Sequence, residues 1–358
     1  MARDTATVAM IVAIPLLQLI IFGYAINTNP RNLPTAIVNP DHSNFSRRIL
    51  VGMQNSTYFK FISPSSTEAE ALDLLKRGKV QFVVNFPPNF SHDLVKGLKP
   101  TLLLQADATD PAATTRALTV FADLAAVGLK EELVGPLSKL AASPTAYQPL
   151  IHAVYNPLAI TAYNIVPGLL GVVLTMTMVI ITALVITKEY ERGTMENLLA
   201  TPLRPMEIII GKIVPYIIVG YLQVFLILIM AKYMFSVPMQ GSILLLLLLC
   251  FPFIAANLAV GLTFSTLASN QLQAVEGALF FFLPSILLSG FMFPFRGMPE
   301  WAQWVGNILP MTHFLVIVRG ILLKGNGWLE IWPEVMRINL FMVVALLISF
   351  KRFRRTLD

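Results

Sequence analysis

The sequence predicts an α-helical membrane protein with six transmembrane helices and an α/β domain outside the cytoplasm. The chain of 358 residues is 56% hydrophobic and 13% charged, whereas about 25% of a soluble domain is charged. Its apolar residues gather into runs near the length of about 20 residues that a helix needs to cross a bilayer. Residues 27–160 differ, because short strand patterns alternate with helical patterns there. The two compositions predict two kinds of structure in one chain.

Six apolar runs are expected to span the membrane. They are Thr5–Ile26, Ile165–Thr187, Ile213–Phe235, Ser242–Leu267, Gly277–Phe295 and Ile338–Phe350, the last extended outward through Trp332–Arg337. Trp301–Leu323 is also apolar, but Pro310, His313 and Arg319 interrupt it. We expect an external re-entrant or interfacial hairpin there, within residues 296–331, and a structural role for His313 rather than a proton relay.

The positive residues predict the orientation, since Lys and Arg concentrate on the cytoplasmic side of membrane proteins. They follow the second and last spans: Lys188, Arg192, Arg204, Lys212, Lys351, Arg352, Arg354 and Arg355. Both termini are therefore expected in the cytoplasm. The net charge of +6 is explained by this orientation and does not predict nucleic-acid binding. The expected parts are a first helix (1–26), an external domain (27–160) and a five-helix bundle (161–358).

The external domain is expected to hold a mixed, partly parallel sheet, because strands and helices alternate. The strands are predicted at Pro34–Asn39, Tyr58–Ile62, Val80–Phe86 and Thr101–Ala106. The helices are predicted at Phe45–Gln54, Thr67–Arg77, Asn89–Lys96 and Thr114–Leu133, before a return segment at Gly135–Pro157.

No catalytic or metal site is predicted. Ser91, His92 and Asp93 are adjacent, whereas a catalytic triad is assembled from distant segments. We expect Ser91 to be a local helix cap and Asp110 a turn residue before Pro111. Cys250 is the single cysteine, and it is expected to be a small buried apolar side chain.

The predicted spans contain almost no ionisable residues. Lys232 lies near one span end and Glu276 near another. A carrier driven by protons or sodium usually needs such a residue inside the membrane, so this class is disfavoured. The polar residues in or beside the spans are Asn164, Thr175, Thr177, Gln223, Asn257 and Ser285. Hydrogen bonding between helices explains them, and lining a substrate path is the alternative for the last five.

Energy for transport must then come from a partner. The chain has no GxxxxGK[ST] sequence, so it has no phosphate-binding loop of its own. The charged segment Lys188–Lys212 separates two spans, and we expect a short helix in it, within 188–204. Glu189, Arg192 and Glu196 would share one face of that helix. An ordinary charged loop that only fixes the orientation is the alternative.

The segment ERGTMENLLATPLRPMEIIIGK (Glu191–Lys212) resembles the loop between the second and third spans of ABC-2 type permeases. These are the membrane halves of bacterial ABC exporters, of the YhhJ/YbhR/YbhS-like inner-membrane group. IPLLQLIIFGYAI (Ile14–Ile26) and the segment Leu287–Gly325 extend the resemblance over nearly the whole chain. It implies the ABC-2, or type V exporter-like, transmembrane fold.

The resemblance also implies roles. The coupling helix would contact an ABC ATPase subunit through Glu191, Arg192, Gly193, Thr194, Glu196 and Leu198. ATP and Mg would bind that subunit, and this chain would bind no cofactor. A second permease copy or a paralogue would complete the pathway. The size and position of the external domain, rather than the resemblance, suggest that it binds a periplasmic adaptor or gates the exit.

The implied function is outward transport of a hydrophobic or amphiphilic molecule, a drug or a lipid, across the bacterial inner membrane. Family members usually have a cytoplasmic stretch before the first span that often ends in Arg-Asp-Pro. Here Arg3-Asp4 stands at the start, which favours a shortened gene start. A membrane scaffold or receptor with a ligand-binding external domain stays open as the alternative, and an ion-coupled carrier ranks below it.

Overall fold

The chain forms two compact units, one of residues Asn27–Asn164 and one that includes Ile165–Asp358. The computed structural model describes residues 30–64, 67–127, 129, 147–158, 160–193 and 205–355. The expected first span, Thr5–Ile26, lies outside these residues. Each unit is described by itself below.

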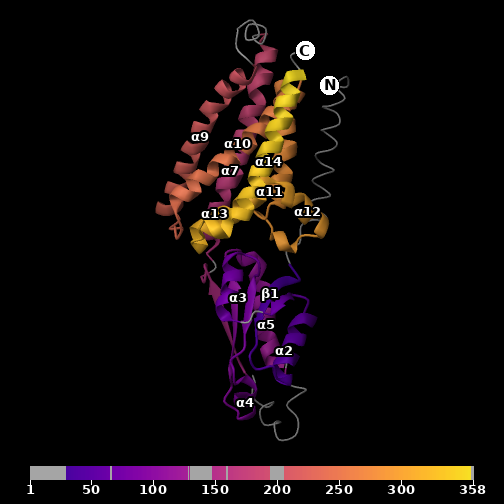
Figure 1. The fold of residues 1–358 in the computed structure, drawn as a ribbon, viewed down its shortest axis with the longest axis vertical. Helices are drawn as coiled ribbons and strands as arrows, with labels where there is room; N and C mark the ends of the chain where they lie inside the picture. The colour runs from indigo at the N-terminus through magenta and orange to yellow at the C-terminus, as the bar shows by residue number, and fades with distance from the viewer. Residues whose placement is uncertain are drawn as a thin grey trace. The chain divides into compact units, whose positions relative to one another are not determined.

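The first unit is a five-stranded mixed sheet with helices packed on it (Figure 1). Along the chain its elements are β1 (Leu33–Val38), α2 (Asn44–Asn55), β2 (Phe59–Pro64), α3 (Glu68–Lys76), β3 (Phe82–Asn85), α4 (Phe90–Val95), β4 (Thr101–Asp107), α5 (Pro111–Val127) and β5 (Gln148–Val154). The spatial order is β2-β1-β3-β4-β5, and all neighbours are parallel except β3 and β4. The predicted mixed sheet is confirmed, with its four predicted strands close to their expected positions.

Local sequence explains where these elements begin. The Ser43 hydroxyl accepts a hydrogen bond from the Ser46 amide and caps α2, and Thr67 caps α3 in the same way. Side-chain caps of this kind satisfy amides that have no partner within the helix. Under the helices, Phe59 and Phe82 pack edge to face, 5.3 Å between ring centres, a geometry that adds about 0.5–1.5 kcal/mol to simple burial.

One strand was missed. β5 lies in the segment expected to be an irregular return to the membrane, and it pairs in parallel with β4 over its whole length. It is an edge strand with mostly exposed or half-buried side chains. An edge strand does not need the alternating apolar pattern that marks a half-buried one, and Pro149 within it argues against a strand by sequence.

The second unit is helical (Figure 1). Its helices are α7 (Thr161–Glu191), α9 (Pro205–Tyr233), α10 (Ile243–Leu267), α11 (Gln271–Leu288), α12 (Glu300–Ile308), α13 (Pro310–Lys324) and α14 (Trp328–Arg355). Five of the described helices are long and apolar enough to cross a membrane: α7, α9, α10, α11 and α14. α12 and α13 are bent by 83° to each other, the geometry of a broken span or a re-entrant loop.

The boundaries of several of these helices differ from those of the predicted spans. α11 starts six residues before the expected Gly277, because the Asn270 side chain caps it by accepting from the Gln273 amide. It also ends early, before Gly290 at φ +84°. α9 already begins at Pro205, and proline favours the first turn of a helix. α14 is one continuous helix from Trp328.

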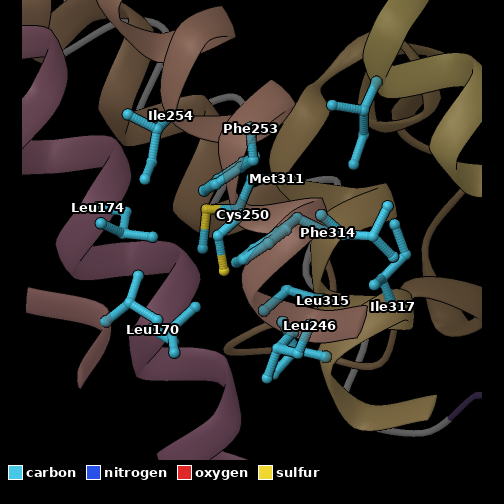
Figure 2. Close-up of a cluster of buried hydrophobic side chains, with 14 of the residues drawn as sticks. Leu170, Leu174, Leu246, Cys250, Phe253, Ile254, Met311, Phe314, Leu315 and Ile317 are labelled. Atoms are coloured by element: carbon cyan, nitrogen blue, oxygen red, sulfur yellow. The ribbon is translucent and has the colours of Figure 1, made fainter. Parts of the chain in front are cut away.

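α10 lies at the centre of the helical unit and contacts α9, α11, α13 and α14. Figure 2 shows side chains of α7, α10 and α13 meeting around the buried Cys250. Phe253 of α10 stacks on Phe314 of α13, with ring centres 3.9 Å apart. On another face of α10, a Cβ on Gly261 would lie 2.5 Å from the Val179 carbonyl oxygen of α7. Glycine thus permits close approach of two membrane helices.

Candidate coupling and transport site

The C-terminal end of α7 is bonded to two neighbouring helices through its last turns. Lys212 Nζ of α9 lies 2.8 Å from Glu189 Oε1, and both side chains are partly buried. The Thr187 backbone N–H donates to Ser265 Oγ of α10 over 3.1 Å. The Thr187 and Ser265 hydroxyls also lie 3.2 Å apart. These contacts hold the end of α7 against both α9 and α10.

Glu191, the last residue of α7, makes a third connection, to the start of α11. The Gln271 backbone N–H donates to Glu191 Oε1 over 2.6 Å, and the Gln271 side-chain amide donates to Oε2. The Gln271 side-chain hydrogen bond, followed by the backbone one, lowers the pKa of the Glu191 carboxyl below its usual value. The first amides of a helix have no partner within the helix, so this carboxylate supplements the Asn270 cap.

The segment after Glu191 departs from the expected separate helix. Residues 188–191 continue α7, and a turn follows at Arg192 and Gly193, where Gly193 has φ +68°. Glycine adopts this left-handed conformation without the cost that a side chain adds. Thr194, Glu196 and Leu198 lie outside the described residues. The role of this segment in ATPase contact stays a prediction.

The five residues proposed for a substrate path differ in their hydrogen-bond partners. Thr177 Oγ1 lies 2.9 Å from Gln223 Oε1 and links α7 to α9. Asn257 and Ser285 instead donate to carbonyls of their own helices, at Phe253 and Phe281. Among the described residues, the hydroxyl of the buried Thr175 has no hydrogen-bond partner. One pair thus joins two helices, as the interpretation by hydrogen bonding between helices expects. The substrate-path role stays a prediction.

The bend between α12 and α13 is held by His313. Pro310 is the first residue of α13, where its missing amide costs nothing. His313 is buried, with Nδ1 2.5 Å from Glu334 Oε2 of α14 and Nε2 2.8 Å from the Asn307 carbonyl of α12. Glu334 also accepts from Arg337 Nη1, over 2.8 Å and 3.0 Å. The structural role expected for His313 agrees with these contacts.

The sheet unit shows no arrangement for catalysis among its described residues. Ser91 donates from its amide and its hydroxyl to Asp41 Oδ1, over 3.0 Å and 2.7 Å. The expectation that Ser91 is a local cap was therefore wrong, since it anchors a loop fifty residues away. The described hydrogen bond of the His92 side chain is to its neighbour Asp93, at 3.3 Å. No group of three potential metal-binding side chains was found in the described part of the chain.

Gln271 and Glu334 were missed by sequence reasoning. A signal for Gln271 was present, because Asn270 followed three residues later by Gln273 resembles a capping box and marks a helix start. No local signal pairs Glu334 with His313, since the contact joins residues 21 apart across a bend.

Comparison with known proteins shows the family. The chain matches the ABC-2 family transporter protein family over residues 5–351. It is 30% identical over 355 residues to "Probable multidrug ABC transporter permease YbhS" of Escherichia coli (strain K12), which covers 97% of this chain and 90% of that protein. It is 28% identical to "Probable multidrug ABC transporter permease YbhR" of the same strain, over 92% of this chain and 90% of that protein. "Inner membrane transport permease YhhJ", also of that strain, is 28% identical over 96% of this chain and 93% of that protein.

The matches cover nearly the whole sequence. The structure agrees with them, because its described helices include five that can cross a membrane and one bent pair. The chain therefore belongs to the ABC-2 family of transporter proteins.

Proposed function

We propose that this chain is the permease subunit of an ATP-driven exporter, powered by a separate ABC ATPase subunit. The observation that carries the proposal is the end of α7, where hydrogen bonds and an ion pair from α9, α10 and α11 surround one short polar segment. A force applied to that segment would reach several membrane helices at once. The family membership supplies the partner, because ABC-2 permeases work with ABC ATPases and as pairs.

The polar end of the helical unit is proposed to face the cytoplasm. Ser349 Oγ near the end of α14 bonds to the Ala259 carbonyl and to Thr263 of α10. The positive residues in the last turns of α14 therefore lie at the same end as Lys188 and Lys212, and Lys and Arg favour the cytoplasmic side. The sheet unit would then lie outside, in the periplasm of a bacterium.

The opposite end carries the aromatic residues of a membrane interface. All four tryptophans of the chain lie in α12 and the start of α14, and all are exposed: Trp301, Trp304, Trp328 and Trp332. Tryptophan concentrates where lipid headgroups meet the hydrocarbon core. We place α12 at the outer interface, and the exposed apolar faces of α9 and α14 against lipid or a second permease copy.

The proposed substrate is a hydrophobic or amphiphilic molecule that moves outward. Two of the relatives are named as multidrug permeases, and the described helical unit is apolar along most of its length. A periplasmic adaptor that binds the sheet unit is a further proposed partner.

The test of coupling is to scramble Glu191–Glu196 and measure assembly with the ATPase. The scrambled permease should insert in the membrane but bind the ATPase weakly and lose ATP-driven transport. The control is the double variant Asp73→Asn/Arg77→Gln, which removes an exposed ion pair of α3 and should leave both unchanged. Unchanged assembly and transport in the scrambled variant would favour a scaffold or receptor.

The test of orientation is labelling of single cysteines in intact cells. Cys250 is the only cysteine of the chain and is buried. Labelling of a variant with one added cysteine therefore reports the position of that cysteine. An impermeant maleimide added outside should label Lys96→Cys of the sheet unit and leave Arg192→Cys unlabelled. The reverse pattern would invert the proposed orientation.

A further inference from the structure

The two carboxylates at the end of α7 bind different helices. Glu189 accepts from Lys212 of α9, whereas Glu191 uses both of its oxygens on Gln271 of α11. The bidentate contact joins a carboxylate to one amide of the backbone and one of a side chain. It fixes direction as well as distance, since paired hydrogen bonds add geometric specificity.

The Glu191 carboxylate also suits the N-terminus of α11 electrostatically. A helix of this length has a partial positive charge at its start, which favours a nearby anion. Asn270 already accepts from the Gln273 amide, so Glu191 adds a cap at the adjacent Gln271 amide from another helix. The last residue of α7 and the first of α11 are thereby joined.

α11 makes close contacts at its other end as well. A Cβ on Gly306 of α12 would lie 2.6 Å from the Leu288 carbonyl, the last residue of α11. Arg319 of α13 donates to the Gly290 carbonyl over 3.2 Å. If α11 were displaced along its axis, its end would therefore push or pull on the bent pair α12–α13.

We propose that Glu191 is a positioning residue inside the permease, which joins the end of α7 to α11, rather than a contact residue for the ATPase. This inference rests on the proposed function. Motion imposed on the segment after Glu191 is passed through Gln271 to α11, and through α11 to the α12–α13 bend. Gln271, which lies outside the expected coupling segment, is then as important for transport as Glu191.

The test exchanges the two side chains in the full permease, reconstituted with its ATPase. E191Q places two amides opposite each other, and Q271E places two carboxylates there. Each single variant should keep wild-type assembly with the ATPase but transport roughly three- to tenfold less substrate per ATP hydrolysed, the scale of one ordinary hydrogen bond. The exchange E191Q/Q271E restores one amide and one carboxylate and should recover most of the transport.

Three outcomes separate the explanations. Recovery in the exchange variant with unchanged assembly supports the proposal. Weakened ATPase binding by E191Q that the exchange does not repair would overturn it and return Glu191 to the ATPase contact. If the wild-type permease binds no ABC ATPase at all, the proposed function is refuted, and the inference with it.

A cross-link provides a second measurement that does not require the single variants to fold. If the two positions move together, joining E191C to Q271C with a short thiol-specific linker should preserve ATP-driven transport, and the unlinked pair should transport less. Loss of transport on linking would show that the positions separate during the cycle, which contradicts the proposal.

Discussion

The Glu334 carboxylate of α14 lies 2.5 Å from Nδ1 of His313 in α13, while Nε2 of the same ring faces the Asn307 carbonyl of α12. Both ring nitrogens thus face oxygen atoms. Three helices meet at this one imidazole. The bend between α12 and α13 is therefore maintained by polar contacts as well as by packing.

Replacing His313 should destabilise the helical unit. His313→Ala would leave the Glu334 carboxylate without its buried partner, and we expect a loss of about 1–3 kcal/mol, the cost of an unsatisfied buried polar group. The matched control is Val316→Ala in the same helix, where the side chain is exposed. Thermal unfolding in nanodiscs measures both, and equal midpoints would contradict the structural role of His313.

The link between Thr177 and Gln223 should show as coupling in a double-mutant cycle. Hydrogen bonds between membrane helices contribute about 0.6 kcal/mol on average, so T177V and Q223L should each cost about that much. The double variant should cost little more than either, because both remove the same bond. Unchanged stability with a changed KM for transport would instead favour the substrate-path role.

Gly261 should tolerate no side chain. Its Cβ would meet the Val179 carbonyl at 2.5 Å, so Gly261→Ala should push α7 from α10 and cost about 1–3 kcal/mol, as overpacked cores do. Gly211→Ala is the control, since nothing lies within 4 Å of its Cβ position. The yield of folded protein and its midpoint of thermal unfolding should fall for the first variant only.

Asp41 should make the stability of the sheet unit depend on pH. Partial burial raises the pKa of this carboxyl, but hydrogen bonds from Ser43 and Ser91 outweigh that effect and lower it below the usual value. The carboxylate therefore stabilises the fold above the pKa of the unfolded state, and this contribution disappears as the pH falls through the lower folded pKa.

The measurement is thermal unfolding of the full chain between pH 7 and pH 3. Asp41→Asn should be less stable than wild type at pH 7, with a difference that shrinks towards acid. Asp73→Asn is the control. It keeps Asp41, so its stability should still fall towards acid pH as that of the wild type does. A pH-independent difference between Asp41→Asn and wild type would refute the assignment.

Periodicity and composition were sufficient for the long elements. The apolar run Ser242–Leu267 became α10 almost residue for residue, with Ser242 as its cap, because a span is specified by its own composition. The boundary of α11 was misplaced where a polar first turn, Gln271–Gln273, precedes the apolar part. Hydropathy alone does not mark this polar turn as helical, and one of its capping partners, Glu191, lies 80 positions away in the sequence.

The candidate site was predictable only as a segment. Glu191 was named from a resemblance, but its partner on α11 depends on tertiary packing. In the same way, the contact between His313 and Glu334 depends on the bend at Leu309 that brings them together.

The central claim is that a separate ATPase drives export through this chain. The direct measurement is accumulation of a hydrophobic fluorescent drug in inside-out membrane vesicles that contain the permease and its partner ATPase. Accumulation that requires ATP, and that disappears when Glu191–Glu196 is scrambled, is the predicted result. Accumulation that follows a proton gradient without ATP, or that persists in the scrambled variant, would contradict the account.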